Sequence, residues 1–271
     1  MQKIYCFLSC LVIVVSTFSQ QNTIKYGDNS SAGKYYNIRG IKIYCETYGS
    51  GMPLLMIHGN GGSISSFANN IPYFAKKYKV IAVDSRSQGK SVDRRDSLSF
   101  EMMADDFAVL LDTLHIRSAY VLGWSDGGIN ALLLAIRHPE KVIKLASTGA
   151  NLWPDSTALI PSLWKEMNAY YETSSNKKLT TAKERNDWKL FLLDFQQPHI
   201  PLSALHAIKC PSLIIGGDHD LIPVQHTKLI AENIPHAVLW VVPNSGHATL
   251  IEHKDEFNKR TDGFFSGDFT K

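Results

Sequence analysis

The chain has 271 residues, of which 44% are hydrophobic and 20% charged, which excludes a disordered or fibrous protein and suits one α/β core with room for a small insertion. Its 28 basic and 25 acidic residues are spread along the chain, and the formal net charge is +3. No basic block is longer than a pair such as Arg94 with Arg95, which excludes the charge pattern of a nucleic-acid-binding protein.

The first nineteen residues have the order of a secretory signal peptide. Lys3 supplies a positive charge, residues 4–15 are almost wholly apolar, and the next four residues end in the small Ser19. The apolar run is shorter than the roughly 20 residues that a transmembrane helix needs. We therefore predict cleavage after Ser19 and a secreted or periplasmic protein without a membrane span. An uncleaved anchor, or a lipid on Cys10 inside the apolar run, is a less favoured alternative.

After this segment, short apolar runs alternate with helical stretches, a pattern typical of a parallel sheet flanked by helices. The runs are rich in Val, Ile and Leu, as expected when both faces of the sheet are covered. Strands are expected at Ile41–Tyr48, Pro53–Ile57, Val80–Asp84, Ala119–Gly123, Val142–Thr148, Ser212–Gly216 and Val238–Val242. Helices are expected at Ser63–Lys77, Phe100–Leu114, Gly127–His138, Val224–Ile234 and near Ile251–Phe265.

One interval, residues 150–205, breaks the alternation. It contains no apparent strand, it is rich in aromatic residues, and its helices are expected at Leu159–Tyr171 and Thr181–Phe195. We predict a helical cap here, inserted into a core formed by residues 20–149 and 206–271. Trp164 and Trp188 of the cap are candidate substrate contacts, because small-molecule sites are mostly apolar. The alternative is that these rings only hold the cap onto the sheet.

The segment from Gly123 to Gly127 reads Gly-Trp-Ser-Asp-Gly and matches the G-x-S-x-G pattern of a nucleophile elbow. In such an elbow the serine lies on a strained turn between a strand and a helix, and the small flanking residues let the backbone crowd without clashes. The expected strand before this segment and the expected helix after it supply that context. Ser125 is therefore the predicted nucleophile.

A serine hydroxyl needs a base to take its proton and an acid to orient that base. In this type of fold the three follow in the order serine, acid, histidine. His247 comes directly after the last expected strand and is the predicted base. Asp218 and Asp220 both follow the strand before it, and we favour Asp220 because it lies further into the loop. Asp218 is expected to accept hydrogen bonds from backbone amides of its own turn.

A tetrahedral intermediate needs two hydrogen-bond donors directed at its oxyanion. Residues 58–62 read His-Gly-Asn-Gly-Gly and follow an expected strand, at the position where this type of fold supplies one donor. We predict the backbone N–H groups of Asn60 and Asp126 as the two donors. The segment lacks the spacings of the common phosphate-binding loops, and His58 is expected to brace it.

Four cysteines occur in the sequence, and the two that lie beyond the signal peptide are Cys45 and Cys210. Export permits a disulfide between them. Cys210 stands just before an expected buried strand, where cysteine often acts as a small hydrophobic residue. We therefore expect two free, buried thiols.

Together, the segments HGNGG, DSRSQGKS, GWSDGG, GGDHDLIP and SGHATLIE resemble the α/β-hydrolase superfamily over residues 37–265. Residues 121–142 are similar to the valacyclovir hydrolase (biphenyl hydrolase-like) group and to related bacterial esterases and carbon–carbon bond hydrolases. The resemblance implies a mostly parallel eight-stranded sheet, a helical cap between strands six and seven, no cofactor, and a triad of Ser125, Asp220 and His247. One departure is Ser87, where relatives usually have glycine in a structural loop.

These features predict hydrolysis of a small-molecule carboxylic ester through an acyl-enzyme on Ser125, without a metal. Amide, thioester, lactone and carbon–carbon bond cleavage remain open with the same residues. A non-catalytic ligand receptor on the same fold is the alternative from another class, and the intact triad argues against it. In the valacyclovir hydrolase group, the aspartate matching Asp126 binds the α-amino group of amino-acid esters. The resemblance thus makes Asp126 a candidate substrate-binding residue, although it could instead bond the surrounding loops.

Overall fold

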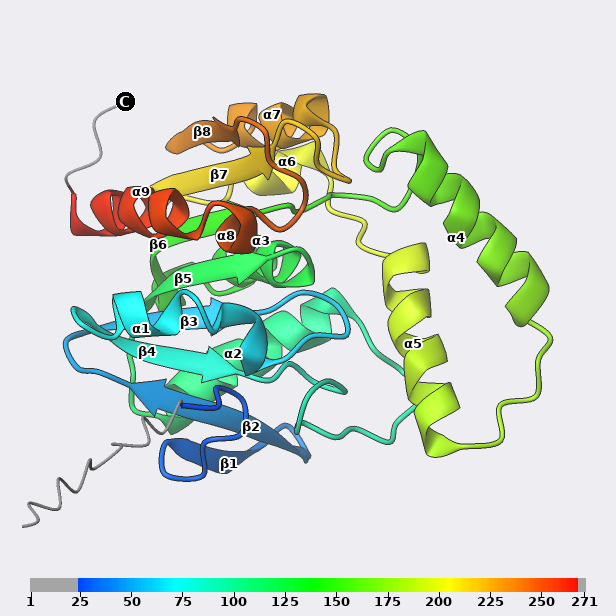
Figure 1. Cartoon of the computed structure of the whole chain (residues 1–271), viewed down its shortest axis with the longest axis horizontal. Coiled ribbons are helices and arrows are strands. Elements are labelled where there is room, and N and C mark those ends of the chain that lie inside the picture. The colour runs from blue at the N-terminus through cyan, green and yellow to red at the C-terminus, as the bar shows by residue number, and fades with distance from the viewer. Residues whose placement is uncertain (1–23, 268–271) are drawn as a thin grey trace, which may run out of the picture.

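The computed structural model describes residues 24–267, and its eight strands form one sheet (Figure 1). The predicted signal peptide lies outside the described residues. The spatial order of the strands is β1-β2-β4-β3-β5-β6-β7-β8. Only the pairs β1–β2 and β2–β4 are antiparallel, so the mostly parallel α/β-hydrolase sheet is confirmed. The strands are β1 Gly33–Ile38, β2 Ile41–Tyr48, β3 Met52–Ile57, β4 Tyr78–Val83, β5 Ala119–Trp124, β6 Val142–Thr148, β7 Ser212–Gly217 and β8 Ala237–Val242.

Helices cover both faces of this sheet (Figure 1). Successive residues of a strand point to opposite faces, and along β3 Leu55 and Ile57 join one hydrophobic cluster while Leu54 and Met56 join the other. The first cluster includes side chains of α2, α3 and α7, and the second includes those of α1 and α9. The helices are η1 Ile64–Phe67, α1 Ile71–Phe74, α2 Phe100–Thr113, α3 Asp126–Arg137, η2 Pro139–Lys141, α4 Pro161–Ser174, α5 Ala182–Gln196, α6 Leu202–Leu205, α7 Val224–Glu232, α8 Thr249–Glu252 and α9 Lys254–Ser266.

Two differences between the elements and the sequence-based expectation have a clear physical cause. Strand β1 was not expected, because it lies at the edge of the sheet and alternates exposed residues such as Tyr35 with the buried Ile38, so it lacks a continuous apolar run. The single helix expected at Ser63–Lys77 is instead the two short helices η1 and α1. Pro72 lies at the start of α1, where its missing N–H is tolerated, whereas it would interrupt a longer helix.

The cap is formed by α4 and α5, which follow β6 and precede β7 and lie beyond the carboxyl ends of the parallel strands (Figure 1). A set of aromatic rings joins the two helices. Phe195 of α5 stacks on Trp164 and Tyr171 of α4, with ring centroids 5.4 and 4.6 Å apart. Trp188 stacks on Tyr171 and on Phe191. The cap is therefore held together by its own aromatic residues.

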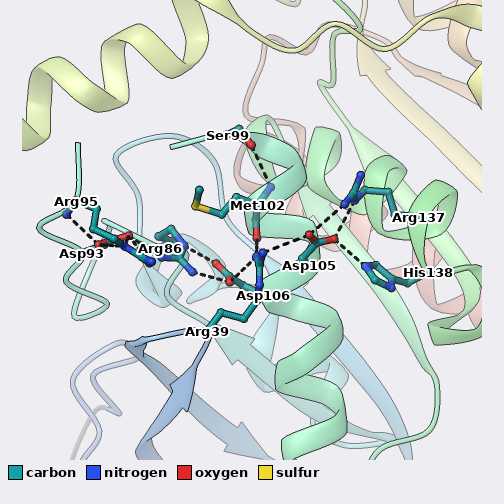
Figure 2. Close-up of polar contacts among 10 residues, drawn as sticks. All are labelled: Arg39, Arg86, Asp93, Arg95, Ser99, Met102, Asp105, Asp106, Arg137 and His138. Atoms are coloured by element: carbon teal, nitrogen blue, oxygen red, sulfur yellow. Dashed lines mark hydrogen bonds and ion pairs between the residues drawn. The ribbon is translucent and has the colours of Figure 1, made fainter. Parts of the chain in front are cut away.

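The loop after β4 belongs to the core and forms hydrogen bonds with α5 of the cap. A buried arginine anchors this loop (Figure 2). Arg86 is 1% exposed and donates two hydrogen bonds of 2.6 Å to the carboxylate of Asp106 on α2 and one of 2.6 Å to Asp93. Removing these charges from water costs free energy, and the three charge-assisted hydrogen bonds offset that cost. From α5, Asn186 donates to the Ser87 carbonyl.

Cys45 and Cys210 are free thiols as predicted, although Cys210 is only partly buried. In residues 24–267 no helix is both long and apolar enough to cross a membrane. The same residues contain no group of three or more His, Cys, Asp or Glu side chains that could hold a metal ion.

Candidate active site

Ser125 lies on the turn between β5 and α3, and its backbone has φ 56° and ψ −120°. This conformation is strained for a residue with a side chain, and it persists where the surroundings impose it. The Ser125 N–H donates to the Thr148 carbonyl at 2.8 Å, which ties the turn to β6. A Cβ on Gly127 would lie 1.9 Å from the Ile57 carbonyl oxygen, so only glycine allows α3 to begin this close to β3. The turn therefore presents Ser125 at the carboxyl edge of the sheet.

The three residues predicted from the sequence as nucleophile, base and acid lie in one hydrogen-bonded line. His247 Nε2 is 2.9 Å from Ser125 Oγ, and His247 Nδ1 is 2.6 Å from Asp220 Oδ1. The Asp220 side chain has no solvent exposure and that of His247 has 21%. When Nδ1 carries the proton and donates it to Asp220, Nε2 is left to accept the Ser125 hydroxyl, the arrangement that a general base requires.

The two aspartates after β7 make different contacts. Asp220 accepts the Ile222 N–H at 3.1 Å in addition to the His247 ring, which holds its carboxylate in place. Asp218 is exposed and accepts the N–H groups of Asn244 and Ser245, each at 3.0 Å. These two backbone hydrogen bonds lower the pKa of Asp218 to about 2. Asp218 therefore braces the loop that carries the histidine, and Asp220 contacts the histidine itself.

Three further residues position His247, and sequence reasoning did not find them. Trp124 Nε1 donates to the His247 carbonyl at 2.9 Å. The Glu252 carboxylate accepts the Gly246 N–H at 2.7 Å. Gly149 has φ 65°, and a Cβ there would lie 2.8 Å from His247 Cε1. Of these three contacts, only that of Glu252 could have been suspected from the sequence, because Glu252 lies five residues after His247. Trp124 and Gly149 lie about a hundred positions before His247.

Asn60 and Asp126, the predicted oxyanion donors, both line the cavity at Ser125. Asp126 is the first residue of α3, so its backbone N–H has no acceptor within the helix and lies at the positive end of the helix dipole. A Cβ on Gly59 would lie 2.9 Å from Ser125 Cβ, so the loop after β3 passes close to the nucleophile. The Asn60 side chain donates to the Leu190 carbonyl of α5 at 3.1 Å, which ties this loop to the cap.

His58 braces the same loop, as predicted. Its Nδ1 lies 2.7 Å from the Gly59 carbonyl oxygen, and its Nε2 accepts the Ser85 N–H at 3.0 Å. The ring is 1% exposed, and burial lowers the pKa of His58 to about 4. It is therefore neutral near pH 7 and joins the loops after β3 and β4.

A cavity of about 400 Å³ opens at Ser125 between the core and the cap. Its apolar wall includes Leu163 and Met167 of α4 and Phe191 of α5. Neither Trp164 nor Trp188, the expected substrate contacts, is among the lining residues. Their rings stack on Phe195 and Phe191, and of this aromatic stack only Phe191 also borders the cavity. Leu163 and Met167 are four residues apart and so share one face of α4, the face that borders the cavity.

Two carboxyl groups line this cavity next to the nucleophile. Asp126 is 3% exposed, and its Oδ2 has no hydrogen-bond partner among the described residues. Asp194 of α5 lines the same cavity. Burial, and then the charge of Asp194, raises the pKa of Asp126 well above its ordinary value, and burial raises the pKa of Asp194 to about 6. Because the two carboxyl groups are buried side by side, ionisation of one disfavours ionisation of the other.

Asp194 was missing from the sequence-based set of site residues. An acidic residue on a helix outside any motif is most often exposed to solvent. Its residue type therefore did not identify Asp194 as a site residue. Only the packing of α5 over the carboxyl edge of the sheet brings it to Asp126.

Comparisons with known proteins agree with this architecture. Residues 52–187 match the family model of the alpha/beta hydrolase fold. The chain is 31% identical over 249 residues to 2-hydroxymuconate semialdehyde hydrolase of Pseudomonas sp. (strain CF600), covering 80% of this chain and 88% of the relative. It is 29% identical over 247 residues to serine hydrolase BPHL of Mus musculus, covering 84% of each. A solved meta-cleavage product hydrolase from Pseudomonas fluorescens IP01 is similar with a TM-score of 0.70 and 26% identity, covering 89% of this chain and all of the other.

The relatives agree on the reaction type more than on the bond that is cleaved. Their names specify hydrolases, and the solved enol-lactonase of Burkholderia xenovorans LB400, at 20% identity and a TM-score of 0.70, has the same fold. The match to the family model extends from β3 into α5 and so includes the elbow at Ser125. This chain is an enzyme of the α/β-hydrolase family.

Proposed function

We propose that the chain hydrolyses small-molecule carboxylic esters through an acyl-enzyme on Ser125. The observation that supports this most directly is the unbroken line of hydrogen bonds from Asp220 through His247 to Ser125, at the floor of a largely apolar cavity. The apolar wall suits an acyl or alcohol group, and the serine lies where a bound carbonyl carbon can be reached.

In the acylation step, His247 Nε2 takes the proton of the Ser125 hydroxyl as Oγ attacks the ester carbonyl carbon. The carbonyl oxygen becomes an oxyanion, and the backbone N–H groups of Asn60 and Asp126 stabilise it. The buried Asp220 carboxylate stabilises the imidazolium that forms. Collapse of the intermediate breaks the bond between carbon and the alcohol oxygen, and the leaving alcohol takes the proton from Nε2.

In the deacylation step, a water molecule replaces the alcohol. His247 Nε2 takes one proton of this water as its oxygen attacks the acyl carbon, and the same two N–H groups stabilise the second oxyanion. Collapse releases the carboxylic acid and returns the proton to Ser125 Oγ. The pathway needs no group beyond these side chains, the two amides and water.

Ser125→Ala tests this proposal, with Ser65→Ala, a change of an exposed serine in helix η1, as a matched control. Ser125→Ala should lose both ester hydrolysis and covalent labelling by an organophosphonate while its thermal unfolding stays close to that of the wild type. Ser65→Ala should keep both activities. Labelling of Ser125→Ala at the wild-type rate would refute the nucleophile, and absence of turnover on a broad ester panel by the wild type would favour the receptor alternative.

We further propose that the preferred esters carry a protonated amine. The supporting observation is the carboxyl pair of Asp126 and Asp194, which has an unpartnered buried oxygen, in a cavity whose lining contains no Lys or Arg side chain. A carboxylate next to a developing oxyanion is unfavourable unless a positive charge compensates it, and a substrate ammonium group would do so. An anionic substrate would meet two acids, so esters are favoured over the carboxylate-bearing substrate in the name of the muconate semialdehyde hydrolase.

An α-amino ester and its des-amino analogue test this second proposal. One charge-assisted hydrogen bond contributes roughly 1.5–3 kcal/mol, so the wild type should prefer the amino ester by about ten- to a hundredfold in kcat/KM. Asp126→Asn and Asp194→Asn should each reduce that preference while Asp187→Asn, an exposed change on the same helix α5, leaves it unchanged. A wild type without preference, or a preference that survives in both active-site variants, would exclude amine binding without affecting the assignment of Ser125.

A further inference from the structure

A second cavity, of about 580 Å³, lies between the loop after β4 and the first half of α5. It shares no lining residue with the cavity at Ser125. Trp188 and Lys189 border this second cavity, whereas Phe191 and Asp194 border the first. Helix α5 therefore separates two distinct cavities.

The second cavity is rich in positive charge. Arg94, Arg185 and Lys189 line it, and within residues 24–267 none of them forms an ion pair of 4 Å or less. The Lys189 ammonium group is partly buried and donates to the carbonyl oxygens of Asp93 and Arg95 at 2.9 and 2.8 Å. Neutral carbonyl groups orient these charges but do not compensate them.

The acidic residues of this cavity do not balance that charge. Asp93 is buried and already binds Arg86 at 2.6 Å and Arg95 at 3.0 Å (Figure 2). Asp96 also lines the cavity and is exposed. Its single negative charge cannot balance those of Arg94, Arg185 and Lys189, so the lining keeps an excess of positive charge. An anion placed there would therefore find cations that the protein itself leaves uncompensated.

Ser87 lines this cavity, and its hydroxyl oxygen is buried in the cavity wall. The residue is 5% exposed, and its Oγ has no hydrogen-bond partner among the described residues. Its backbone has φ 66°, a conformation that favours glycine. A strained serine with a buried, unpartnered hydroxyl is unfavourable for stability alone, and such strain is concentrated at functional sites. The Ser87 carbonyl also accepts the Asn186 side chain of α5, so the serine lies where loop and cap meet.

We propose that this cavity is a binding site for a small oxyanion, a carboxylate or a phosphate group, separate from the catalytic site. The Arg185 guanidinium and the Lys189 ammonium supply charge-assisted hydrogen bonds, and the unpartnered Ser87 hydroxyl turns about its Cα–Cβ bond to supply a neutral donor. The bound anion bridges the loop after β4 and helix α5.

Calorimetric titration of the full mature chain with inorganic phosphate and with succinate tests the site, with sodium chloride of matched ionic strength as the baseline. At least one of the two anions should bind saturably above that baseline. Arg185→Gln should weaken this binding about tenfold, the effect of one partly exposed charge-assisted hydrogen bond. Lys183→Gln is the matched control, because Lys183 lies on the same helix, pairs with Asp187 and does not line the cavity. It should bind as the wild type does.

Ser87→Gly separates a binding role from a structural one. Glycine relieves the positive φ, so the melting temperature should stay the same or rise, while anion affinity should fall about fivefold with loss of the hydroxyl donor. Enzyme blocked at Ser125 by an organophosphonate should keep full anion affinity. The proposal is refuted if neither anion binds saturably, if Lys183→Gln weakens binding as much as Arg185→Gln, if Ser87→Gly binds as the wild type does, or if the blocked enzyme no longer binds.

Discussion

Replacing Asp220 by asparagine tests the geometry of the proposed active site most directly. Asp220 Oδ1 accepts both the His247 ring at 2.6 Å and the Ile222 N–H at 3.1 Å, and Oδ2 accepts the Gly217 N–H at 3.4 Å. An asparagine amide must therefore place its NH2 group opposite one of these donors. With the amide oxygen at the Oδ1 position, the ring keeps its tautomer and only the long bond to Gly217 is lost. With the NH2 there, the ring must present an unprotonated Nδ1.

The two orientations of the asparagine amide give the limits of the expected decrease in kcat. In the first, the imidazolium loses its anionic partner, and a charge-assisted hydrogen bond of roughly 1.5–3 kcal/mol corresponds to a loss of about ten- to a hundredfold. In the second, Nε2 carries the proton and cannot act as a base, a defect that decreases kcat by about 10⁴ in the best-studied serine protease triad. We expect kcat of Asp220→Asn to fall by between about 10-fold and about 10⁴-fold.

Asp218→Asn is the matched control, because Asp218 lies two residues away and is exposed. Its carboxylate accepts only the two loop amides and the side chain of His219, and an amide oxygen can still accept one of them. Its kcat should fall by less than about tenfold. Steady-state ester hydrolysis, with active-site titration by an organophosphonate and circular dichroism to verify folding, measures both. A larger loss in Asp218→Asn than in Asp220→Asn would refute the assignment of the acid.

Three further outcomes are expected. Because burial lowers the pKa of His58 to about 4 from an ordinary 6.5, the unfolded state binds the proton first, and stability falls as pH drops from 6.5 to 4 by roughly 3 kcal/mol. The free energy of unfolding, measured by urea titration at a series of pH values, should depend less on pH between 6.5 and 4 in His58→Gln than in the wild type. The same pH dependence in both proteins would contradict this prediction. Trp188→Ala should lower the melting temperature but leave relative kcat/KM across an acyl chain-length series unchanged, whereas Phe191→Ala should change that series; the opposite pattern would place the tryptophan in the pocket. Intact-mass analysis of the exported protein should show an amino terminus near Gln20, and retention of Met1 would exclude cleavage.

Local patterns in the sequence predicted the central part of the sheet and the proposed nucleophile. Strands β5 and β6 begin where expected because buried parallel strands are continuous runs of Val, Ile and Leu, and such runs need no knowledge of distant residues. The elbow at Ser125 was equally local, since five consecutive residues specify a strained turn. His247 and Asp220 followed from chain order, because parallel strands bring their carboxyl ends to one edge.

Only the tertiary structure decided which side chains of the cap face the cavity. Trp164 and Phe191 are both apolar aromatic residues in cap helices, yet only Phe191 lines the cavity at Ser125. Helical periodicity shows which residues share a face, but the rotation of each helix depends on how α4 and α5 pack on each other and on the sheet. That packing pairs Asp194 with Asp126 and brings Ser87 and Arg185 to the lining of one cavity. Neither pair is visible in the sequence, because contacts between distant segments depend on how the elements are oriented in space and not on local spacing.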